Sequence, residues 1–341
     1  MTARNSLHSR RRLLGSLLAA TASFSSGAIA MPATNARTRA LPAPAIELAV
    51  KYRDVDIDGL HIFYREAGQP DAPTLLLLHG FPSSSHMYRD LIPGLADRYH
   101  VVAPDYPGFG YSDFPDRGRF SYTFECYARL VDRFVQQLGL DRHALYIQDY
   151  GAPIGLRLAL LAPERVSALI VQNGNAYEEG LSADWDALKD HWRNPTPASR
   201  EKLRGWLSAD GIRQQYTAGL TAEQAARISP DTWNLDWALL KRPGNIDVQL
   251  DLFGDYRSNV ALYPQFQRFL REHRPPTLIV WGRHDPFFTI GGAQAFRRDV
   301  PDAELHLLDA GHFALETHAA EIAQLMREFL ARRLEVPKAI R

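Results

Sequence analysis

Short apolar runs alternate with amphipathic stretches along the chain from Val55 onward. Because such runs suit buried strands and the amphipathic stretches suit helices, the alternation predicts a mostly parallel β-sheet with helices on both faces. The two clearest helices are predicted at residues 123–138 and 321–334. The predicted strands are residues 60–64, 74–78, 100–104, 144–147, 168–171, 277–281 and 304–308.

The alternation stops after Asn173-Gly174-Asn175, and residues 176–262 contain several helical runs without a strand-like one. This segment is predicted to be a helical cap over the sheet, while residues 46–175 and 263–341 form the core. Two interpretations of the cap stay open: an apolar lid over a small-molecule pocket, or a separate small helical core. Five of the six tryptophans lie in the cap: Trp185, Trp192, Trp206, Trp233 and Trp237.

The N-terminus has the three-part pattern of an export signal. Arg10-Arg11-Arg12 precedes an uncharged stretch rich in Leu, Ala and Ser that ends in Ala28-Ile29-Ala30. It resembles a twin-arginine signal peptide over residues 1–30, with cleavage after Ala30, and residues 31–45 read as a flexible leader. The apolar part is too short for a membrane span, which takes about 20 apolar residues. We therefore expect an exported, periplasmic protein without stable membrane insertion.

Charge and composition exclude several kinds of partner. The chain has 39 basic and 39 acidic residues, and loss of the four arginines of the signal leaves a net charge of −4. Because the chain has no dense basic block beyond its N-terminus, nucleic acid is not expected as a partner. The lone Cys126 cannot form an intramolecular disulfide and is predicted to be a small buried residue. The histidines lack metal-ligand spacing and Gly108-Phe109-Gly110 lacks a third glycine, so neither a metal nor another cofactor is predicted.

Ligands of a doubly wound sheet bind beyond the carboxyl ends of its parallel strands. The segments that follow the predicted strands are therefore the candidates for a site. Five of them combine glycine with polar or acidic residues: His79-Gly80-Phe81-Pro82, residues 105–112, Gln148-Asp149-Tyr150-Gly151, Gly282-Arg283-His284-Asp285 and Asp309-Ala310-Gly311-His312-Phe313.

The turn at Asp149 has the features of a nucleophile elbow, a sharp strand-to-helix turn that exposes one side chain above the sheet. Gly151 and Ala152 are small where the helix must pack close to the strand, and Gly155 lies about one helical turn further on. An aspartate at a helix start is most often a cap, but a cap gives no reason for these small residues. We therefore predict that Asp149 is a nucleophile, next to a helix N-terminus that favours negative charge.

Asp149, Asp285 and His312 each follow a predicted strand, in the order nucleophile, acid, histidine. Together with the other strand ends, this order resembles the α/β-hydrolase superfamily over essentially the whole mature chain. The resemblance implies the α/β-hydrolase fold: a mostly parallel eight-stranded sheet, helices on both faces and a helical cap inserted after strand 6. The chain has no Gly-x-Ser-x-Gly motif, so a serine esterase or lipase would lack its nucleophile.

An aspartate at the elbow resembles the epoxide hydrolase and haloalkane dehalogenase branches of that superfamily. The resemblance implies that Asp149 attacks an sp³ carbon and forms an ester, which suits a group that is already ionised near neutral pH. His312 would be the base for the water that opens the ester, and Asp285 would orient the imidazolium. The backbone N–H groups of Phe81 and Tyr150 would hold the developing oxyanion.

Two motifs resemble epoxide hydrolases, which form vicinal diols. His79-Gly80-Phe81-Pro82 matches their His-Gly-x-Pro loop, in which His79 is expected to be structural and Pro82 to shape the oxyanion loop. Tyr256-Arg257 matches the placement of a cap tyrosine that protonates the leaving oxygen. Tyr256 is therefore the predicted acid, with Tyr216 as a possible second tyrosine.

Haloalkane dehalogenases usually carry Trp directly after the nucleophile and often Asn in the loop, where this chain has Tyr150 and Phe81. The Gln148-Asp149 pair is nevertheless similar to a dehalogenase. Fluoroacetate dehalogenases, with Arg after the nucleophile, are less similar. We rank epoxide hydrolase first and haloalkane dehalogenase second, with another hydrolase or a lyase behind them, on a small apolar substrate and water. A catalytically silent binding protein is disfavoured, because all three positions carry competent residue types.

Overall fold

The computed structural model describes residues 49–334. The predicted signal peptide, residues 1–30, and the predicted leader, residues 31–45, lie outside the described residues. No helix within the described range is both long enough and apolar enough to cross a membrane.

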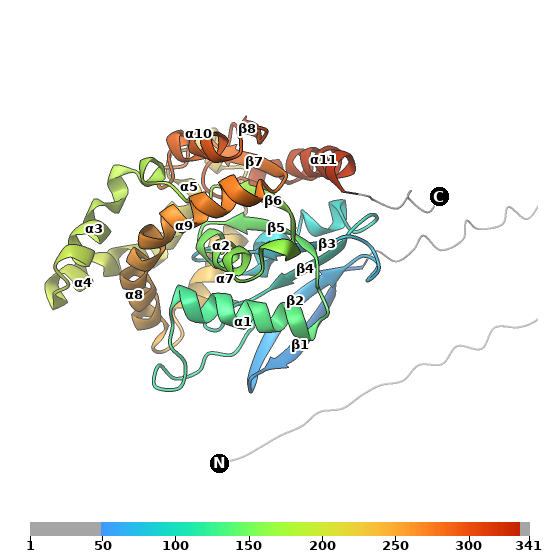
Figure 1. The fold of residues 1–341 in the computed structure, drawn as a ribbon. Coiled ribbons are helices and arrows are strands. Elements are labelled where there is room, and N and C mark those ends of the chain that lie inside the picture. Colours follow the sequence, from blue (N-terminus) through green and yellow to red (C-terminus); the bar gives the residue numbers. More distant parts are fainter. Residues whose placement is uncertain (1–48, 335–341) are drawn as a thin grey trace, which may run out of the picture. The chain divides into compact units, whose positions relative to one another are not determined.

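The core is one eight-stranded sheet (Figure 1). Its strands lie in the order β1-β2-β4-β3-β5-β6-β7-β8. β2 runs antiparallel to both of its neighbours, and all the other pairs are parallel, which confirms the prediction of a mostly parallel eight-stranded sheet. The strands are β1 Lys51–Ile57, β2 Leu60–Ala67, β3 Thr74–Leu78, β4 His100–Pro104, β5 His143–Gln148, β6 Val166–Gln172, β7 Thr277–Gly282 and β8 Glu304–Leu308.

The first strand is the one that no predicted run covers. β1 has the sequence KYRDVDI, and most of its side chains are exposed at the edge of the sheet. An edge strand that buries little carries charges in place of an apolar run, so hydrophobicity does not reveal it. The buried strands β3 and β4, in contrast, have the predicted bounds.

Helices connect the strands and form the insertion. The α-helices are α1 Phe124–Gln137, α2 Gly151–Leu161, α3 Asp186–Arg193, α4 Pro197–Leu203, α5 Ala209–Thr217, α6 Ala222–Ala225, α7 Pro230–Leu240, α8 Asn245–Asp255, α9 Arg257–His273, α10 Ile290–Asp299 and α11 Leu315–Arg333. The shorter 3₁₀ helices are η1 Ser85–Tyr88, η2 Ile92–Gly94, η3 Pro163–Arg165, η4 Glu178–Gly180, η5 Ala183–Trp185 and η6 Arg204–Leu207.

The cap follows β6, as predicted, and consists of α3 to α8 with the start of α9. In Figure 1, α3, α4 and α8 are grouped at the left, while α11 lies at the right. The predicted boundary at residue 262 falls inside α9, because one continuous helix leads from the cap back to the core. α11 likewise begins at Leu315, six residues before its predicted start.

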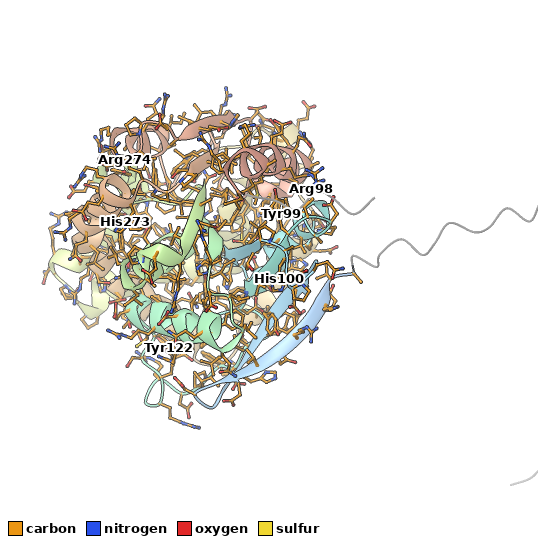
Figure 2. All side chains as sticks on the ribbon, turned by 45° about the vertical axis from the view of Figure 1, so that its right-hand side comes forward. Arg98, Tyr99, His100, Tyr122, His273 and Arg274 are labelled. Carbon is orange, nitrogen blue, oxygen red and sulfur yellow. The ribbon has the colours of Figure 1, made fainter. Side chains whose placement is uncertain are left out.

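Alternate residues of the buried strands point to opposite faces and build two hydrophobic clusters. Leu78 and Ile147 belong to the cluster that includes side chains of α1, α2, α9 and α10. Leu77 and Tyr146 belong to the second cluster, with side chains of η1, η2 and α11. Side chains fill the space between the sheet and the helices on both sides (Figure 2). The rigid sheet therefore holds the carboxyl ends of β3, β5, β6, β7 and β8 at one edge, below the cap.

Candidate active site

Asp149 lies between the end of β5 and the start of α2, with a φ of +48°. This left-handed conformation is uncommon outside glycine and turns the side chain out of the strand. The neighbouring chain has to come very close. A Cβ on Gly80 would lie 2.3 Å from the Asp149 Cβ, and one on Gly151 would lie 1.9 Å from the Leu78 carbonyl oxygen. The small residues around the turn therefore make room for the sharp bend, as predicted for an elbow.

The Asp149 carboxylate is buried and held by backbone. The Phe81 N–H donates to its Oδ1 over 2.6 Å, and only 7% of the residue is exposed. Burial raises the pKa of Asp149 to about 6, because the charged form loses its hydration. The charge of His312 and the N–H groups of Phe81 and Tyr150 act in the opposite direction. A poorly hydrated carboxylate that stays ionised at neutral pH is a strong nucleophile.

The structure brings His312 and Asp285 to this carboxylate. Nδ1 of His312 lies 2.8 Å from Oδ2 of Asp285, and Nε2 lies 3.8 Å from Oδ2 of Asp149. Burial opposes protonation of the ring, but the charges of Asp285 and Asp149 outweigh it, so the pKa of His312 is raised above 6.5. The imidazole can thus take a proton on the side that faces Asp149.

Asp285 accepts hydrogen bonds on both of its oxygens. Its Oδ1 accepts from the backbone N–H groups of Phe287 and Phe288 over 2.8 and 3.1 Å. Its Oδ2 accepts from Nδ2 of Asn173 over 2.8 Å in addition to the His312 contact. Sequence reasoning did not identify Asn173, although its position directly after β6 was the available signal. The Asp285 carboxylate is therefore held by its own loop and by the residue after β6, in addition to its contact with the histidine.

Gln148 is a second residue that sequence reasoning left without a role. Its side chain is fully buried, and its Nε2 lies 3.0 Å from Nε2 of His312. The strand partner of Gln148 in β6 is Gln172, which donates to the His312 carbonyl oxygen over 3.2 Å. The histidine is therefore held by Asp285 and Gln148 at the ring and by Gln172 at the backbone.

His79 and Pro82 lie in the loop that carries the Phe81 N–H. His79 stacks on Tyr106 at 4.1 Å between ring centroids, and its Nε2 accepts from the Tyr106 N–H. Burial lowers the pKa of His79 to about 3, so the ring is neutral. The Phe81–Pro82 peptide bond is cis. This loop is thus packed and neutral around the N–H that contacts Asp149.

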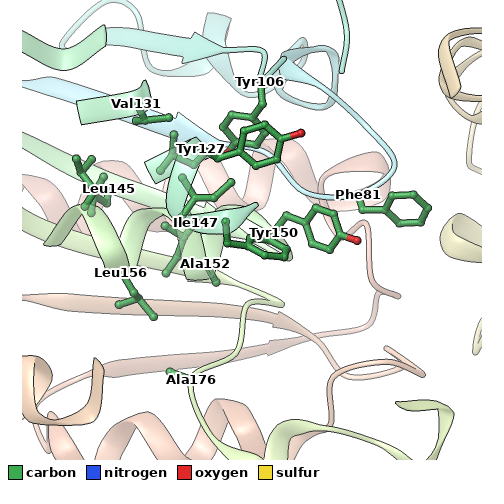
Figure 3. Packing of buried hydrophobic residues seen from close by; sticks show 14 of the residues in the cluster. Phe81, Tyr106, Tyr127, Val131, Leu145, Ile147, Tyr150, Ala152, Leu156 and Ala176 are labelled. Carbon is green, nitrogen blue, oxygen red and sulfur yellow. The ribbon is translucent and has the colours of Figure 1, made fainter. Parts of the chain in front are cut away.

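An apolar cavity opens above Asp149, between the sheet and the cap. Its volume is about 30 Å³, which is room for little more than a water molecule. Figure 3 shows the Tyr150 hydroxyl directed toward the side on which Phe81 lies. A larger surface pocket of about 300 Å³ over α3, α4 and α8 contains none of the predicted site residues. The cavity is lined by Phe81, Asp149, Tyr150, Trp185, Leu188, Trp206, Gln215, Phe253, Tyr256 and Phe287.

Two tyrosines of the cavity have free hydroxyl groups. The buried hydroxyls of Tyr150 and Tyr256 have no hydrogen-bond partner among residues 49–334. Tyr263 lies near Tyr256 and influences its pKa, but the pair does not meet hydrogen-bond geometry. Burial raises the pKa of both cavity tyrosines well above 10, and the Asp149 charge adds to this. Both groups are therefore neutral O–H donors beside the carboxylate.

Tyr216 lies apart from this cavity. Its hydroxyl donates to Oδ2 of Asp236 over 2.5 Å, and its ring stacks on Phe313 at 4.0 Å. The preceding residue, Gln215, lines the cavity instead. Successive helical residues point about 100° apart, so α5 can direct only one of the two side chains to the site. The structure thus brings Tyr256 to Asp149 but not Tyr216.

In the part of the chain that the structure describes, no group of three or more His, Cys, Asp or Glu side chains is arranged to hold a metal ion. What the site can do is nucleophilic attack by a carboxylate, proton transfer through a histidine and donation from two tyrosine hydroxyls.

A family model described as the alpha/beta hydrolase fold matches residues 73–319. The chain belongs to the α/β-hydrolase fold family. The fold predicted from the sequence is therefore confirmed, and the relatives agree that this α/β-hydrolase is an enzyme. An uncharacterised hydrolase of Saccharomyces cerevisiae is 44% identical over 271 residues, which cover 78% of this chain and 92% of that protein.

Two further relatives have named activities. A cis-3-alkyl-4-alkyloxetan-2-one decarboxylase of Xanthomonas campestris is 28% identical over 300 residues, 80% of this α/β-hydrolase and 93% of the relative. Haloalkane dehalogenase 2 of Mycobacterium tuberculosis is 44% identical, but only over 101 residues, 30% of this chain and 35% of the dehalogenase.

Solved structures share the fold of this α/β-hydrolase. The epoxide hydrolase CorEH superimposes with a TM-score of 0.66 at 20% identity and covers 83% of this chain and 99% of its own. The haloalkane dehalogenase DbeA of Bradyrhizobium elkani superimposes with a TM-score of 0.62 at 23% identity and covers 83% and 100%. At these identities the two likenesses show a common architecture and leave the reaction to the residues of the site.

Proposed function

We propose that this hydrolase opens small apolar epoxides to vicinal diols through an ester on Asp149. The observation that carries the proposal is the pair of unpartnered hydroxyls, Tyr150 and Tyr256, in the same apolar cavity as the carboxylate. Ring opening produces an alkoxide, which needs a proton, and a tyrosine O–H can supply one.

In the first step a carboxylate oxygen of Asp149 bonds to an epoxide carbon while the bond from that carbon to the epoxide oxygen breaks. The oxygen leaves with the electron pair and takes a proton from Tyr256, and Tyr150 donates a hydrogen bond to it. The products of this step are a neutral ester on Asp149 and a tyrosinate.

In the second step water attacks the carbonyl carbon of the ester, and Nε2 of His312 takes its proton. The Phe81 and Tyr150 N–H groups hold the oxyanion of the tetrahedral intermediate. Collapse expels the diol oxygen, which takes the second proton of the attacking water and so leaves Asp149 as a carboxylate, and the imidazolium proton returns to the tyrosinate. Ester formation neutralises Asp149, which is one of the two charges that raise the pKa of His312, so it lowers that pKa and favours the neutral ring that can take a proton from water.

Halide displacement is the second candidate, favoured by the Gln148-Asp149 pair and by the similarity to haloalkane dehalogenase 2 over 30% of this chain. A halide ion needs N–H or O–H donors and no proton. Trp185 lines the cavity, but its Nε1–H donates to the Phe287 carbonyl oxygen over 2.9 Å and is not free for a halide. The tyrosine hydroxyls can donate a hydrogen bond in both reactions, but only the epoxide oxygen, which leaves as an alkoxide, also takes a proton from them.

The mass of the intact protein tests the proposal. His312→Gln should let the ester accumulate when it is incubated separately with styrene oxide and with 1-bromobutane. A mass gain equal to the whole epoxide supports the proposal. A butyl adduct with no epoxide adduct would replace it by haloalkane dehalogenase. The ester on Asp149 would be contradicted if neither probe formed an adduct and if Asp149→Asn turned over a substrate of the wild-type enzyme at the wild-type rate.

The tyrosine assignment is tested by single-turnover rates of ester formation. Tyr256→Phe should slow epoxide opening by about 10²-fold or more, the size of a lost general acid, and bromide displacement by much less. Tyr216→Phe is the matched control, because it also removes a buried cap hydroxyl but one that is bonded to Asp236. If Tyr256→Phe slowed both reactions equally, Tyr256 would have a packing role only.

A further inference from the structure

Gln148 contacts the one nitrogen of His312 that must carry out proton transfer. Its Nε2 lies 3.0 Å from Nε2 of the ring, whereas Nδ1 of the ring is bonded to Asp285. The other atom of the amide, Oε1, is buried against Gly80 without a partner in the described residues. The side chain is fully buried and belongs to the last residue of β5, so neither solvent nor a flexible loop accounts for this placement.

The hydrogen-bond chemistry of the two groups fixes what the contact can be. If the amide nitrogen faces His312, it donates to the lone pair of a neutral Nε2. If the amide is turned over, Oε1 accepts from a protonated Nε2 and the NH₂ group lies against Gly80. The first arrangement leaves a carbonyl unpartnered and the second leaves N–H donors unpartnered, which native structures tolerate less readily.

We propose that Gln148 is a positioning residue that donates to Nε2 of His312 and holds the ring neutral, with its proton on Nδ1, in the free enzyme. The inference rests on the proposed function, in which His312 is the base that opens the ester. A water that approaches Nε2 replaces the amide as the donor, so the contact keeps the base available until the ester has formed.

The charged groups that face His312 explain why such a residue is needed. Asp285 from the loop after β7 and Asp149 from the turn after β5 both favour the imidazolium, and burial alone opposes them. Three aromatic rings pack around the imidazole and bring no charge: Phe287, Phe288 and Phe313. A protonated His312 would pair with Asp149, which weakens the nucleophile, and could not accept a proton from water. A donor aimed at Nε2 counteracts the two carboxylates.

The test is a titration of the full chain labelled with ¹⁵N-histidine and followed by NMR, with the His312 signals assigned by their loss in His312→Gln. Gln148→Met removes the donor at nearly constant volume and should raise the pKa of His312 by about half a unit to one unit, the size of one hydrogen bond. Gln148→Glu should raise the pKa further, because a carboxylate can only accept from Nε2–H.

Gln172→Met is the matched control. Gln172 is also the buried last residue of its strand and also contacts His312, but through the backbone carbonyl. It should leave the pKa of His312 within a few tenths of a unit, while both methionine variants lose some stability. Should Gln148→Met not fold, Gln148→Asn shortens the side chain by one CH₂ and is expected to raise the pKa in the same way.

An unchanged or lowered pKa of His312 in the Gln148 variants would overturn the inference, since a lowered value means that the amide accepts from the imidazolium. The titration needs no substrate. A raised pKa without any ester on Asp149 would therefore refute the proposed function alone, and an ester with an unmoved pKa would refute the role of Gln148 alone. In the active enzyme, the acid limb of turnover should move to higher pH in Gln148→Met by the same shift.

Discussion

The backbone conformation and the burial of Asp149 both lower the free energy of unfolding. Its backbone is in the left-handed region, and its carboxylate lies among Phe81, Tyr150 and other apolar side chains, where the charged form is poorly hydrated. The Phe81 N–H and His312 offset only part of this, since the pKa of Asp149 stays raised. A reactive carboxylate and a stable fold therefore make opposite demands at this residue.

Asp149→Asn should abolish turnover and stabilise the protein at pH 8. The folded pKa of about 6 lies above the unfolded value of 3.8, so the folded state binds the proton more tightly. The free energy of unfolding consequently falls as pH rises from about 4 to about 6 and stays reduced above that range. Removal of the charge should restore about 1 to 3 kcal/mol at pH 8.

Urea unfolding of both proteins at pH 8 and pH 4.5 measures this effect. At pH 4.5 the wild-type carboxyl is mostly protonated, so the gain from Asp149→Asn should largely vanish. A variant that is destabilised at pH 8 but not at pH 4.5 would show that the ionised carboxylate contributes to stability after all. Asparagine also adopts the left-handed region readily, which keeps the backbone at residue 149 comparable.

The sequence predicts the placement of residues that are recognised by their order along the chain. It does not predict the role of residues whose contacts depend on the direction of a side chain. Asp149, Asp285 and His312 each follow a strand of the sheet, and parallel strands bring such positions to one edge whatever the details of packing. Gln148 and Asn173 also lie at strand ends, but their roles depend on which way an amide points across the sheet. A sequence does not specify that direction.

At the scale of elements, the break between α8 and α9 places Tyr256. Asp255 at the end of α8 accepts from the Phe124 N–H at the start of α1 over 2.8 Å. In the first turn of α9, Oδ1 of Asn259 accepts from the buried guanidinium of Arg157 in α2. Two core helices therefore fix the cap on either side of the tyrosine, which explains how a cap residue is aligned with a nucleophile on the sheet.

The same scale explains why one cap tyrosine was easier to predict than the other. The residues on either side of Tyr256, Asp255 and Asn259, make polar contacts to α1 and α2, which pack on the sheet next to the elbow. Tyr216 lies in α5, whose rotation decides whether Tyr216 or Gln215 faces the cavity. Helix rotation follows from packing against several other elements, so the sequence pattern of α5 alone does not determine it.

Asn259→Ala should destabilise the protein and loosen Tyr256. The variant leaves a buried Arg157 without its closest acceptor, which costs about 1 to 3 kcal/mol in the free energy of unfolding. Epoxide opening should slow as well, because Tyr256 precedes Asn259 by one helical turn. Urea unfolding and single-turnover rates measure the two effects.

Ser258→Ala is the control for the neighbouring contact. Ser258 accepts from the other terminal nitrogen of Arg157 over 2.9 Å, but it is only half-buried, so its loss should have a smaller effect on both quantities. If Asn259→Ala lowered stability without changing the rate of epoxide opening, the Arg157 contacts would support the fold and not the position of Tyr256.

At the scale of the whole molecule, the cap has no core of its own. Its buried side chains are divided between the two clusters of the sheet. Trp185, Leu188 and Phe253 belong to the cluster that also contains Leu78 and Ile147 from the sheet. Tyr216 and Ile228 join the cluster of α11 instead. Of the two interpretations of residues 176–262, the structure therefore favours a lid over the sheet and its cavity.

This arrangement predicts that the cap and the core unfold together. Trp281→Phe leaves only the five cap tryptophans, so its fluorescence follows the cap, whereas far-UV circular dichroism follows the whole chain. The two signals should give one coincident urea transition, because exposing the cap also exposes the face of the sheet beneath it. A fluorescence transition at lower urea would mean that the cap detaches as a separate unit.

The size of the cavity limits what can bind in it, because its volume is about 30 Å³ and ligand pockets typically hold about 300 Å³ or more. Binding of a substrate such as styrene oxide therefore requires the groups that line the cavity to move apart, and a single urea transition would mean that they do so without unfolding of the cap.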